Sequence, residues 1–403
     1  MSSLSENSKI PVVVLFQYRV FHYRKALLTL LRDKLADAGV QLELVYGQAY
    51  GDEVLKQDVA EIDWGHEVRN IYVPIKEKKD LCWQPMPQSI RQPDMVIFMQ
   101  ENRLLANYYW ILQSKLGRTR TAYWGHGRDF QSKAPGGLRE RWKKATIRSV
   151  DWWFAYTAMT LDVLKESGFP AERATLLNNS IDTAGFRRDA DAVPPAQIAA
   201  LRAQFDIGEN APVGLFCGSL YPDKKPAFMI AAADLIHQQR SDFRFIVIGD
   251  GQSAGEMRAA ATSRPWMHCV GVKRGLDKAA LFKLAGFVIN PGLVGLHVLD
   301  AFALSLPMLT TRTALHSPEI AYLEHGKTGF ITDDDPHAFA QCAMQLIDDT
   351  AFAARMRAQC HAASLEYSID RMATRFTEGI VRCLKEVPKG RHRLAPDAVP
   401  GAR

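Results

Sequence analysis

The chain has 403 residues, of which 47% are hydrophobic and 23% charged, a balance typical of globular proteins and a length that favours two domains or more. Its formal net charge of +6 is too modest to indicate a nucleic-acid partner, whereas an anionic ligand or membrane surface would account for it. The six cysteines lack C-x-x-C spacing, and we find neither a signal peptide nor an unbroken apolar span, so we expect a cytoplasmic protein without zinc or disulfides.

The N-terminal residues have the pattern of a β-α-β unit. A β-branched run at 12–16 predicts a strand, residues 25–38 a helix and residues 41–46 a second strand, which together open a parallel sheet covered by helices. The first loop carries Arg19, His22 and Arg24 at the carboxyl end of strand one, where ligands of such sheets bind. These cations either bind a ligand or are ordinary surface residues. The loop lacks G-x-G-x-x-G, which counts against a dinucleotide site.

A histidine between two glycines follows a later strand of the same sheet. Residues 95–99 predict a strand, 104–116 a helix and 121–124 a further strand, which leads directly into Gly125, His126 and Gly127. Glycines on both sides leave the imidazole and nearby amides open to a ligand, so a functional role is favoured over a structural one.

A basic segment at 138–148, LRERWKKATIR, carries five cations, one anion and a tryptophan. Such a helix can lie on an anionic membrane face, or it can be a solvated basic helix, and both interpretations stay open. A strand at 151–156, a helix at 159–168 and a strand at 174–177 follow. Residues 183–211 then indicate a helix-bearing linker to a second domain.

The second domain is predicted to begin with a strand at 213–217 that ends in Gly218 and Ser219. Lys224 and Lys225 follow, just before a predicted helix at 228–236. Two adjacent lysines beside a glycine turn suit a phosphate. Strands at 243–248 and 268–272, each followed by a helix, continue the α/β alternation.

The stretch from Phe287 to Thr310 is predicted to hold the main ligand site. A short strand at 287–289 is interrupted by Asn290-Pro291-Gly292 before a helical pattern begins at about Val294. Gly292 and Gly295 allow a sharp turn, and the free N–H groups of the first helical turn form an anion site. Asp300 is the only charged residue between Lys283 and Arg312. It should therefore face a cleft or a ligand hydroxyl, unless it is a satisfied structural carboxylate.

The remaining pattern adds a strand at 308–310, a helix at 336–347 and a helical region at 350–386 that restarts near Ser368. The basic, proline-containing end is predicted to be disordered. We therefore expect an N-terminal domain at 1–205, a C-terminal domain at 206–366, a crossover helix at 367–386 and a tail at 387–403.

Several motifs at fixed places in the chain together carry a family resemblance. They are WGHG (124–127), NNSID (178–182), GSLYPDKK (218–225), GDG (249–251), NPGLVGLHVLDAFALSLP (290–307) and HSPEIAYLEHGKTGF (316–330). Over residues 10–386 the chain resembles the glycosyltransferase family 4 type of retaining, nucleotide-sugar-dependent enzymes. The resemblance implies the GT-B fold, in which two Rossmann-like doubly wound domains face across a cleft and a C-terminal helix returns to the N-terminal domain.

The resemblance also implies roles for individual residues. Lys224, at the leaving diphosphate, and His126, at the transferred sugar, would be catalytic. The donor would be bound by Gly218, Ser219, Lys225, Val272, Gly292, Val294, Gly295, Leu296 and Asp300, with Asp300 on the ribose and the backbone of Val272 on the base. The acceptor would be bound by Arg19, His22 and Arg24.

Two positions depart from the family pattern. The first acid of the family's E-x₇-E motif falls on Gly292, and the arginine beside the phosphate loop is Ser219, which leaves Lys224 and Lys225 to carry that charge. The donor's base and sugar stay open. A non-catalytic nucleotide-sugar-binding protein and a nucleotide-sugar epimerase are the alternative functions.

The expected activity is metal-independent transfer of a sugar from a nucleotide sugar, as co-substrate and with no further cofactor, to a glycan or lipid-linked acceptor. The resemblance implies a place in polysaccharide biosynthesis. We expect the protein in the cytoplasm, with peripheral contact at the inner face of the membrane through 138–148 and no nucleic-acid partner.

Overall fold

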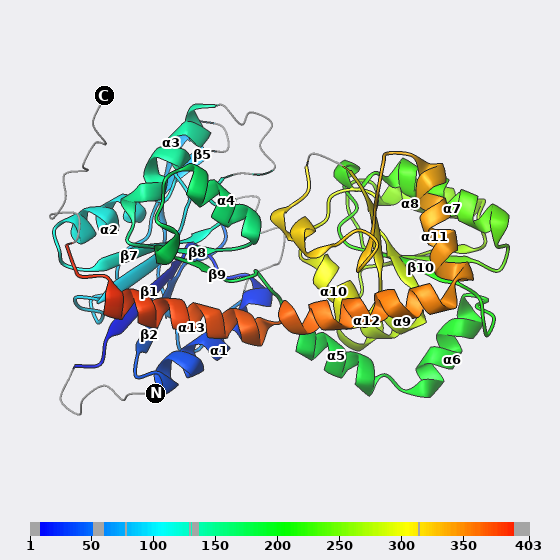
Figure 1. Cartoon of the computed structure of the whole chain (residues 1–403), viewed down its shortest axis with the longest axis horizontal. Coiled ribbons are helices and arrows are strands. Elements are labelled where there is room, and N and C mark those ends of the chain that lie inside the picture. The colour runs from blue at the N-terminus through cyan, green and yellow to red at the C-terminus, as the bar shows by residue number, and fades with distance from the viewer. Residues whose placement is uncertain are drawn as a thin grey trace, which may run out of the picture. The chain divides into compact units, whose positions relative to one another are not determined.

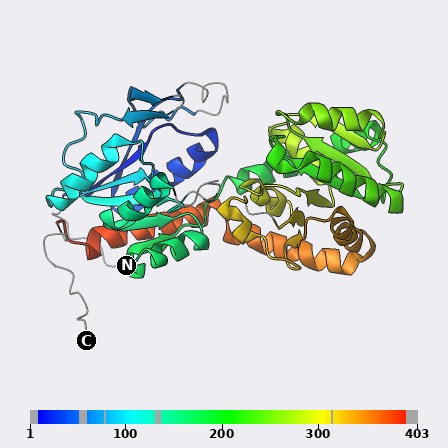
Figure 2. The same cartoon turned by 90° about the horizontal axis from the view of Figure 1, so that it is seen from above.

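The structure is a computed structural model that describes residues 9–50, 60–76, 79–128, 130, 137–312 and 315–390. It divides into two compact units (Figure 1). The first comprises Met1–Asn178 with Asp370–Arg403, and the second comprises Asn179–Ile369. Each unit contains a parallel sheet with helices on its faces (Figure 2), which confirms the predicted α/β class.

The first unit is built on a seven-stranded parallel sheet with the order β3-β2-β1-β6-β7-β8-β9. Its strands are β1 (Val12–Gln17), β2 (Gln41–Tyr46), β3 (His66–Glu67), β6 (Met95–Met99), β7 (Arg120–Gly125), β8 (Trp152–Ala155) and β9 (Ala174–Leu176). The helices are η1 (His22–Arg24), α1 (Lys25–Asp37), α2 (Leu105–Lys115), α3 (Leu138–Thr146), η3 (Ile147–Ser149), α4 (Ala158–Glu166) and η4 (Ala171–Arg173). A separate antiparallel hairpin joins β4 (Ile71–Lys76) to β5 (Lys79–Trp83).

The second unit is built on a six-stranded parallel sheet with the order β12-β11-β10-β13-β14-β15. Its strands are β10 (Val213–Cys217), β11 (Arg244–Ile248), β12 (Met267–Gly271), β13 (Phe287–Ile289), β14 (Met308–Thr311) and β15 (Gly329–Thr332). Its helices are α5 (Thr183–Ala192), α6 (Pro195–Gln204), η5 (Pro222–Lys224), α7 (Pro226–Gln239), α8 (Ala254–Thr262), α9 (Gly275–Leu284), α10 (His297–Ala303), η6 (Pro318–Tyr322), α11 (Pro336–Asp348) and α12 (Thr350–Glu366).

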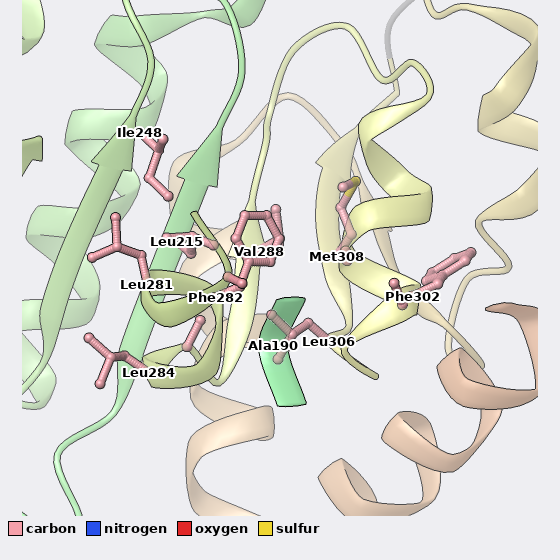
Figure 3. Close-up of a cluster of buried hydrophobic side chains, with 14 of the residues drawn as sticks. Ala190, Leu215, Ile248, Leu281, Phe282, Leu284, Val288, Phe302, Leu306 and Met308 are labelled. Carbon is pink, nitrogen blue, oxygen red and sulfur yellow. The ribbon is translucent and has the colours of Figure 1, made fainter. Parts of the chain in front are cut away.

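The strands of the second unit are apolar on both faces, as a parallel sheet covered by helices requires. In β10 and β13, Leu215 and Val288 pack into one buried cluster, whereas their chain neighbours Phe216 and Phe287 pack into another. Successive side chains of a strand point to opposite faces, so the two clusters are the two sides of the sheet. Figure 3 shows the first cluster, which includes Phe282 of α9 and Val288 of β13.

The segment before β10 belongs to the second unit, unlike the predicted boundary after residue 205. The ring of Phe186 in α5 packs at 88° to that of Phe282 in α9, with 5.1 Å between the centroids. Lys283 of α9 donates a hydrogen bond to the carbonyl of Ala190 at 2.9 Å. α5 and α6 thus pack against the helices of the second unit, and the chain changes unit at 178/179.

The last helix, α13 (Ile369–Glu386), returns the chain to the first unit. The restart predicted near Ser368 is present, since α12 ends at Glu366. Phe376 of α13 packs against Phe154 and Trp124, with ring centroids 4.3 and 5.2 Å apart. Arg120 of β7 donates to the carbonyl of Leu384 at 3.0 Å. Residues 391–403 of the predicted tail lie outside the described residues.

Among the helices that the structure describes, none combines the length and the apolar character that crossing a bilayer requires.

Gly379 offers a test of how closely α13 packs on the first unit. A Cβ at this position would lie 2.4 Å from Thr175 Oγ1 and 2.7 Å from the Phe154 ring. We expect Gly379→Ala to lower the free energy of unfolding by about 2 kcal/mol, because overpacking outweighs the better helix propensity of alanine. Tryptophan fluorescence during urea unfolding measures this, since seven of the eight tryptophans lie in the first unit.

Gly255 in α8 is the matched control, because a Cβ there meets nothing within 4 Å. Gly255→Ala should stabilise the protein by about 0.5 kcal/mol through helix propensity alone. Similar effects of the two substitutions would contradict the close packing of α13.

Candidate functional site

The loop between β13 and α10 is held by side chains that bind its carbonyl groups. Asn290 Nδ2 lies 3.3 Å from the carbonyl oxygen of Gly292 and 3.2 Å from that of Leu293. Thr311 Oγ1 donates to the carbonyl oxygen of Pro291 at 2.6 Å. These donors are buried, so the loop has one fixed shape. We call residues 290–296 the elbow.

The elbow lies directly against the loop that follows β10. A Cβ at Gly292 would lie 2.2 Å from the carbonyl oxygen of Asp223 and 2.4 Å from Lys224 Cα. The amide of Leu293 donates to the Asp223 carbonyl at 2.9 Å. Only glycine fits at 292 with this backbone, so the position has no room for the acid of the family pattern.

The contact between Gly292 and the backbone of residues 223–224 places Lys224 against the elbow. Its side chain is 8% exposed, and its Nζ donates to the carbonyl of Leu293. Burial lowers the pKa of Lys224 to about 8, with the nearby Asp223 opposing this shift. Among the described residues, no carboxylate lies within 4.0 Å of Nζ. An anion placed here would compensate a buried charge that the protein itself leaves unpaired.

Lys225 has a different environment from its neighbour. It adopts the left-handed conformation, with φ of 54°, and caps the start of α7. Its Nζ forms an ion pair with Asp334 and a hydrogen bond to Thr311 Oγ1 at 3.1 Å. The contact with Lys225 lowers the pKa of Asp334. Most of the charge of Lys225 is therefore already balanced.

The helix after the elbow begins later than predicted. The sequence pattern places the start near Val294, whereas α10 starts at His297. The amide of Val294 donates to His316 Nδ1 at 3.1 Å, and His316 Nε2 lies 2.8 Å from the carbonyl oxygen of Thr311. Val294 therefore has no free N–H for a phosphate. Among the described residues, the amides of Gly295 and Leu296 have no acceptor.

Asp300 has a cationic partner that its sequence neighbourhood does not contain. Its Oδ2 lies 2.8 Å from Nζ of Lys278 on α9, and the side chains are 12% and 21% exposed. Burial alone would lower the pKa of Lys278, but the attraction of Asp300 outweighs it and raises that pKa. The Nζ of Lys278 also lies 4.5 Å from the centre of the Phe186 ring.

His297 is close enough to Lys224 and Lys278 for both charges to affect it. It is buried, and its Nε2 has no hydrogen-bond partner among the described residues. Burial, with the charges of Lys224 and Lys278 adding to it, holds the pKa of His297 far below its usual range. Burial also lowers the pKa of His316. Both imidazoles are therefore neutral at pH 7, and the positive charge around the elbow resides on lysines.

The remaining predicted donor residues lie at the carboxyl ends of neighbouring strands of the second unit. The turn after β10 is joined to the loop after β11, because the amide of Leu220 donates to the Asp250 carbonyl at 2.9 Å. Ser219 is exposed on this turn. Val272, just after β12, is 59% exposed. Exposed groups at this edge are accessible to a ligand.

The predicted residues of the first unit fall into a buried group and an exposed one. His126 stacks edge-on with Tyr156, with 4.3 Å between the ring centroids, and its Nδ1 has no partner among the described residues. Burial, together with the charges of Arg24 and Lys143, lowers the pKa of His126 to about 3. Its imidazole is therefore neutral at pH 7.

The three predicted acceptor residues differ in exposure. Arg24 is buried, with its guanidinium 5.0 Å from the Trp124 ring and 5.5 Å from the Tyr156 ring, so it shares the surroundings of His126. Arg19 is also buried and donates to the Tyr18 hydroxyl at 3.0 Å. His22 is exposed. Of these three residues, only His22 is therefore an ordinary surface residue.

The basic segment forms α3 and η3, and only some of its side chains are exposed. Lys143 is buried, and its carbonyl accepts a hydrogen bond from Gln100 at 3.1 Å. Trp142 is 54% exposed and donates to the Tyr108 hydroxyl at 2.9 Å. Lys144 and Arg148 are exposed. A membrane contact through this segment stays a prediction, and Lys143 would not take part in it.

Residues 211–349 match a family model described as Glycosyl transferases group 1. The chain is 27% identical over 250 residues to D-inositol 3-phosphate glycosyltransferase from Thermobispora bispora. That alignment covers 55% of this chain and 54% of the relative, so the chain spans about half the length of the curated protein that it matches.

Solved structures resemble almost the whole chain. The Anabaena HepE structure in complex with UDP has a TM-score of 0.64 at 16% identity and covers 92% of this chain and 99% of that one. The chain has the GT-B fold and carries a glycosyl transferases group 1 domain. A putative UDP-N-acetylglucosamine 2-epimerase from Listeria monocytogenes has a TM-score of 0.61 at 15% identity, over 95% of this chain and 98% of that one. At such identities these structures show the GT-B fold alone, and the family match supports the predicted glycosyltransferase.

In this GT-B chain, several residues that contact the elbow or its neighbouring side chains are not identified by sequence reasoning. Lys278 is 22 positions before Asp300, and no local pattern joins them. His316 lies in the HSPEI motif, which gives no hint that its ring accepts the Val294 amide. Asp334 belongs to an acidic run, DDD, that also supplies the N-cap of α11 at Asp335, and only the fold shows that it faces Lys225.

The pairing of Asp300 with Lys278 predicts a specific effect on stability. Asp300→Ala would leave a largely buried ammonium without its counter-charge, and we expect a loss of about 2 kcal/mol in the free energy of unfolding. The double variant Lys278→Met with Asp300→Leu should regain most of this loss, because neither charge remains. Calorimetric unfolding of the second unit measures both.

Asp333→Ala is the matched control, since the Arg312–Asp333 pair is 70% and 83% exposed. It should change stability by less than about 0.5 kcal/mol. If the single variant at Asp300 were no less stable than this control, the carboxylate would not be needed to balance Lys278.

Proposed function

We propose that this GT-B chain transfers a sugar from a nucleoside diphosphate sugar to a hydroxyl group, with retention of configuration and without a metal ion. The group 1 domain match and the GT-B fold support glycosyl transfer. Anabaena HepE has been solved with UDP and with UDP-glucose, which supports a nucleotide sugar as the donor class.

The observation that carries the proposal is the unpaired ammonium of Lys224 in the elbow. Lys225 and Lys278 have carboxylate partners, whereas Lys224 is more buried and donates to a carbonyl. A lysine with its pKa lowered to about 8 gains the most from a bound anion. The amides of Gly295 and Leu296 could add two neutral donors, so a diphosphate suits the elbow.

The same charge explains how transfer would be accelerated. As the bond between the sugar and the diphosphate lengthens, negative charge grows on the diphosphate oxygens. An ammonium fixed at the elbow stabilises that state more than the bound ground state, which is what raises the rate. The sugar, now electron-poor at its anomeric carbon, accepts the acceptor oxygen on the face that the diphosphate leaves. The acceptor's proton passes to the departing diphosphate.

In the first unit, His126 would contact the transferred sugar and Arg19, His22 and Arg24 the acceptor. A neutral imidazole can exchange hydrogen bonds with sugar hydroxyls without placing a second cation beside the electron-poor carbon. A glycan or lipid-linked acceptor, a place in polysaccharide biosynthesis and a cytoplasmic protein that contacts the membrane through α3 complete the proposal.

An epimerase and a non-catalytic binder are the competing functions on this fold. An epimerase would convert a free nucleotide sugar without any acceptor, and a binder would leave the donor unchanged. Incubating the protein with UDP-, GDP- and ADP-sugars, with and without a glycan mixture, separates these outcomes from transfer.

Removing the Lys224 charge should abolish most of the activity. We expect Lys224→Ala to lower turnover by about 10²-fold or more, as loss of a transition-state charge partner does. Lys224→Met should lose the same activity while keeping the packing of the aliphatic stem, which separates charge from folding. Turnover of the nucleotide sugar is measured for each variant.

Lys327→Ala is the control, because Lys327 is exposed and its ion pair among the described residues is with Glu324, three residues away, at 3.0 Å. Its turnover should match that of the unaltered chain. An unchanged rate in both Lys224 variants would mean that the diphosphate binds elsewhere.

Nucleotide affinity should depend on the protonation of Lys224. The charged form binds the diphosphate and is dominant below pH 8, so affinity is full near pH 7 and falls as the pH rises past the pKa of about 8. We expect about tenfold weaker binding at pH 9 than at pH 7. Titration calorimetry with UDP, GDP and ADP measures this, and Lys224→Met should remove the pH dependence. A flat profile in the unaltered chain would contradict the role of Lys224.

A further inference from the structure

A pocket lies in the first unit, at the opposite edge of its sheet from His126. Its volume is about 640 Å³. Its walls include Gln92 and Thr119, which come just before β6 and β7, and Tyr109 from the middle of α2. In a parallel sheet the starts and ends of strands lie on opposite edges. The pocket is therefore separate from the predicted acceptor residues, which follow strand ends.

One wall of the pocket is aromatic. Tyr109 and Trp110 are consecutive on α2, with ring centroids 5.0 Å apart at 75°. Tyr109 is 44% exposed and also packs edge-on against Trp83, with 6.1 Å between the ring centroids. Met86 and Ile90 continue the apolar surface. Tyr109 thus presents a supported ring to the pocket instead of burying it.

The other wall is polar and held in place. Arg118 Nη1 donates to Gln113 Oε1 at 3.0 Å, and the amide of Arg118 donates to the Gln113 carbonyl at 3.0 Å. The first of these bonds orients the Gln113 side chain, and its N–H₂ group and the other guanidinium N–H groups have no acceptor among the described residues. Gln92 supplies a second amide, and the pocket lining contains no carboxylate.

We propose that this pocket binds a saccharide unit, neutral or acidic, as a second carbohydrate site of the chain. A sugar ring has a C–H face that packs on an aromatic ring and hydroxyls that need donors and acceptors around its rim, and this pocket offers both. An acyl chain would cover the N–H₂ groups of Gln92 and Gln113 without offering them an acceptor, at a cost of about 1–3 kcal/mol for each group that becomes buried. The absence of a lining carboxylate and the presence of Arg118 also admit a sugar acid.

The proposal is tested by saturation-transfer NMR on the full chain, with glucose, galactose, N-acetylglucosamine and glucuronic acid as probes and no nucleotide present. We expect transfer to at least one probe. Tyr109→Ala and Gln113→Ala should each weaken that binding by roughly tenfold, since a ring face or a fixed donor is lost. Tyr109→Leu keeps the apolar contact with Trp83 and should still lose the binding.

Leu112→Ala is the control on the same helix, because Leu112 is 53% exposed and does not line the pocket. It should bind the probe like the unaltered chain. Binding that survives the Tyr109 variants would overturn the proposal, as would binding of dodecyl chains but of no sugar. Because no donor is used, the result is independent of the proposed transfer activity.

Discussion

The contact between Gly292 and the backbone of residues 223–224 is the constraint on which the candidate site depends. β10 and β13 are neighbours in the sheet, so the loops that follow them leave the same edge side by side. Their separation is set by the missing side chain at 292, because a Cβ would lie within 2.5 Å of three backbone atoms. This approach places the Lys224 ammonium on the Leu293 carbonyl. Any larger residue at 292 would push the lysine and the elbow apart.

The charges around the elbow are then distributed unequally. Lys225 is balanced by Asp334 and Lys278 by Asp300, while His297 and His316 are held neutral by burial. The excess positive charge is thereby concentrated on Lys224. In a partly dehydrated site such a charge attracts an anion more strongly than it would in water. Because Lys225 and Lys278 are paired with carboxylates, they do not compete with Lys224 for the same anion.

The sequence predicts those parts of the fold and site that depend on local pattern. The alternation of strands and helices in the sequence predicts both sheets. Because the loops that follow neighbouring parallel strands leave the same edge of a sheet, the same pattern also predicts that Lys224 lies near the elbow. β3, β4, β5 and β15 are missed; β3 has two residues, and β4 contains Pro74 and exposed Ile71 and Val73. The unit boundary is misplaced, since the amphipathic pattern of α5 does not say which sheet the helix covers.

The errors in the site have a common cause. The helix start at Val294 follows from glycine spacing, but the amide of Val294 is taken by His316, 22 residues further along the chain. In the same way, Asp300 looks isolated in the sequence because its partner lies on α9. Partners brought together by tertiary structure leave no local signal. The sequence therefore predicts which loops lie together, but it does not predict which N–H groups within those loops remain free.

Gly292 can be explained in two ways, and the structure separates them. If an acid had simply been lost from a site that kept its shape, an added Cβ would find open space, as it does at Gly255. Instead it would meet the carbonyl oxygen of Asp223 and the Cα of Lys224. Glycine is thus required by a loop that approaches η5 more closely than a side chain would permit. A carboxylate at 292 is therefore excluded by the packing of the elbow against η5.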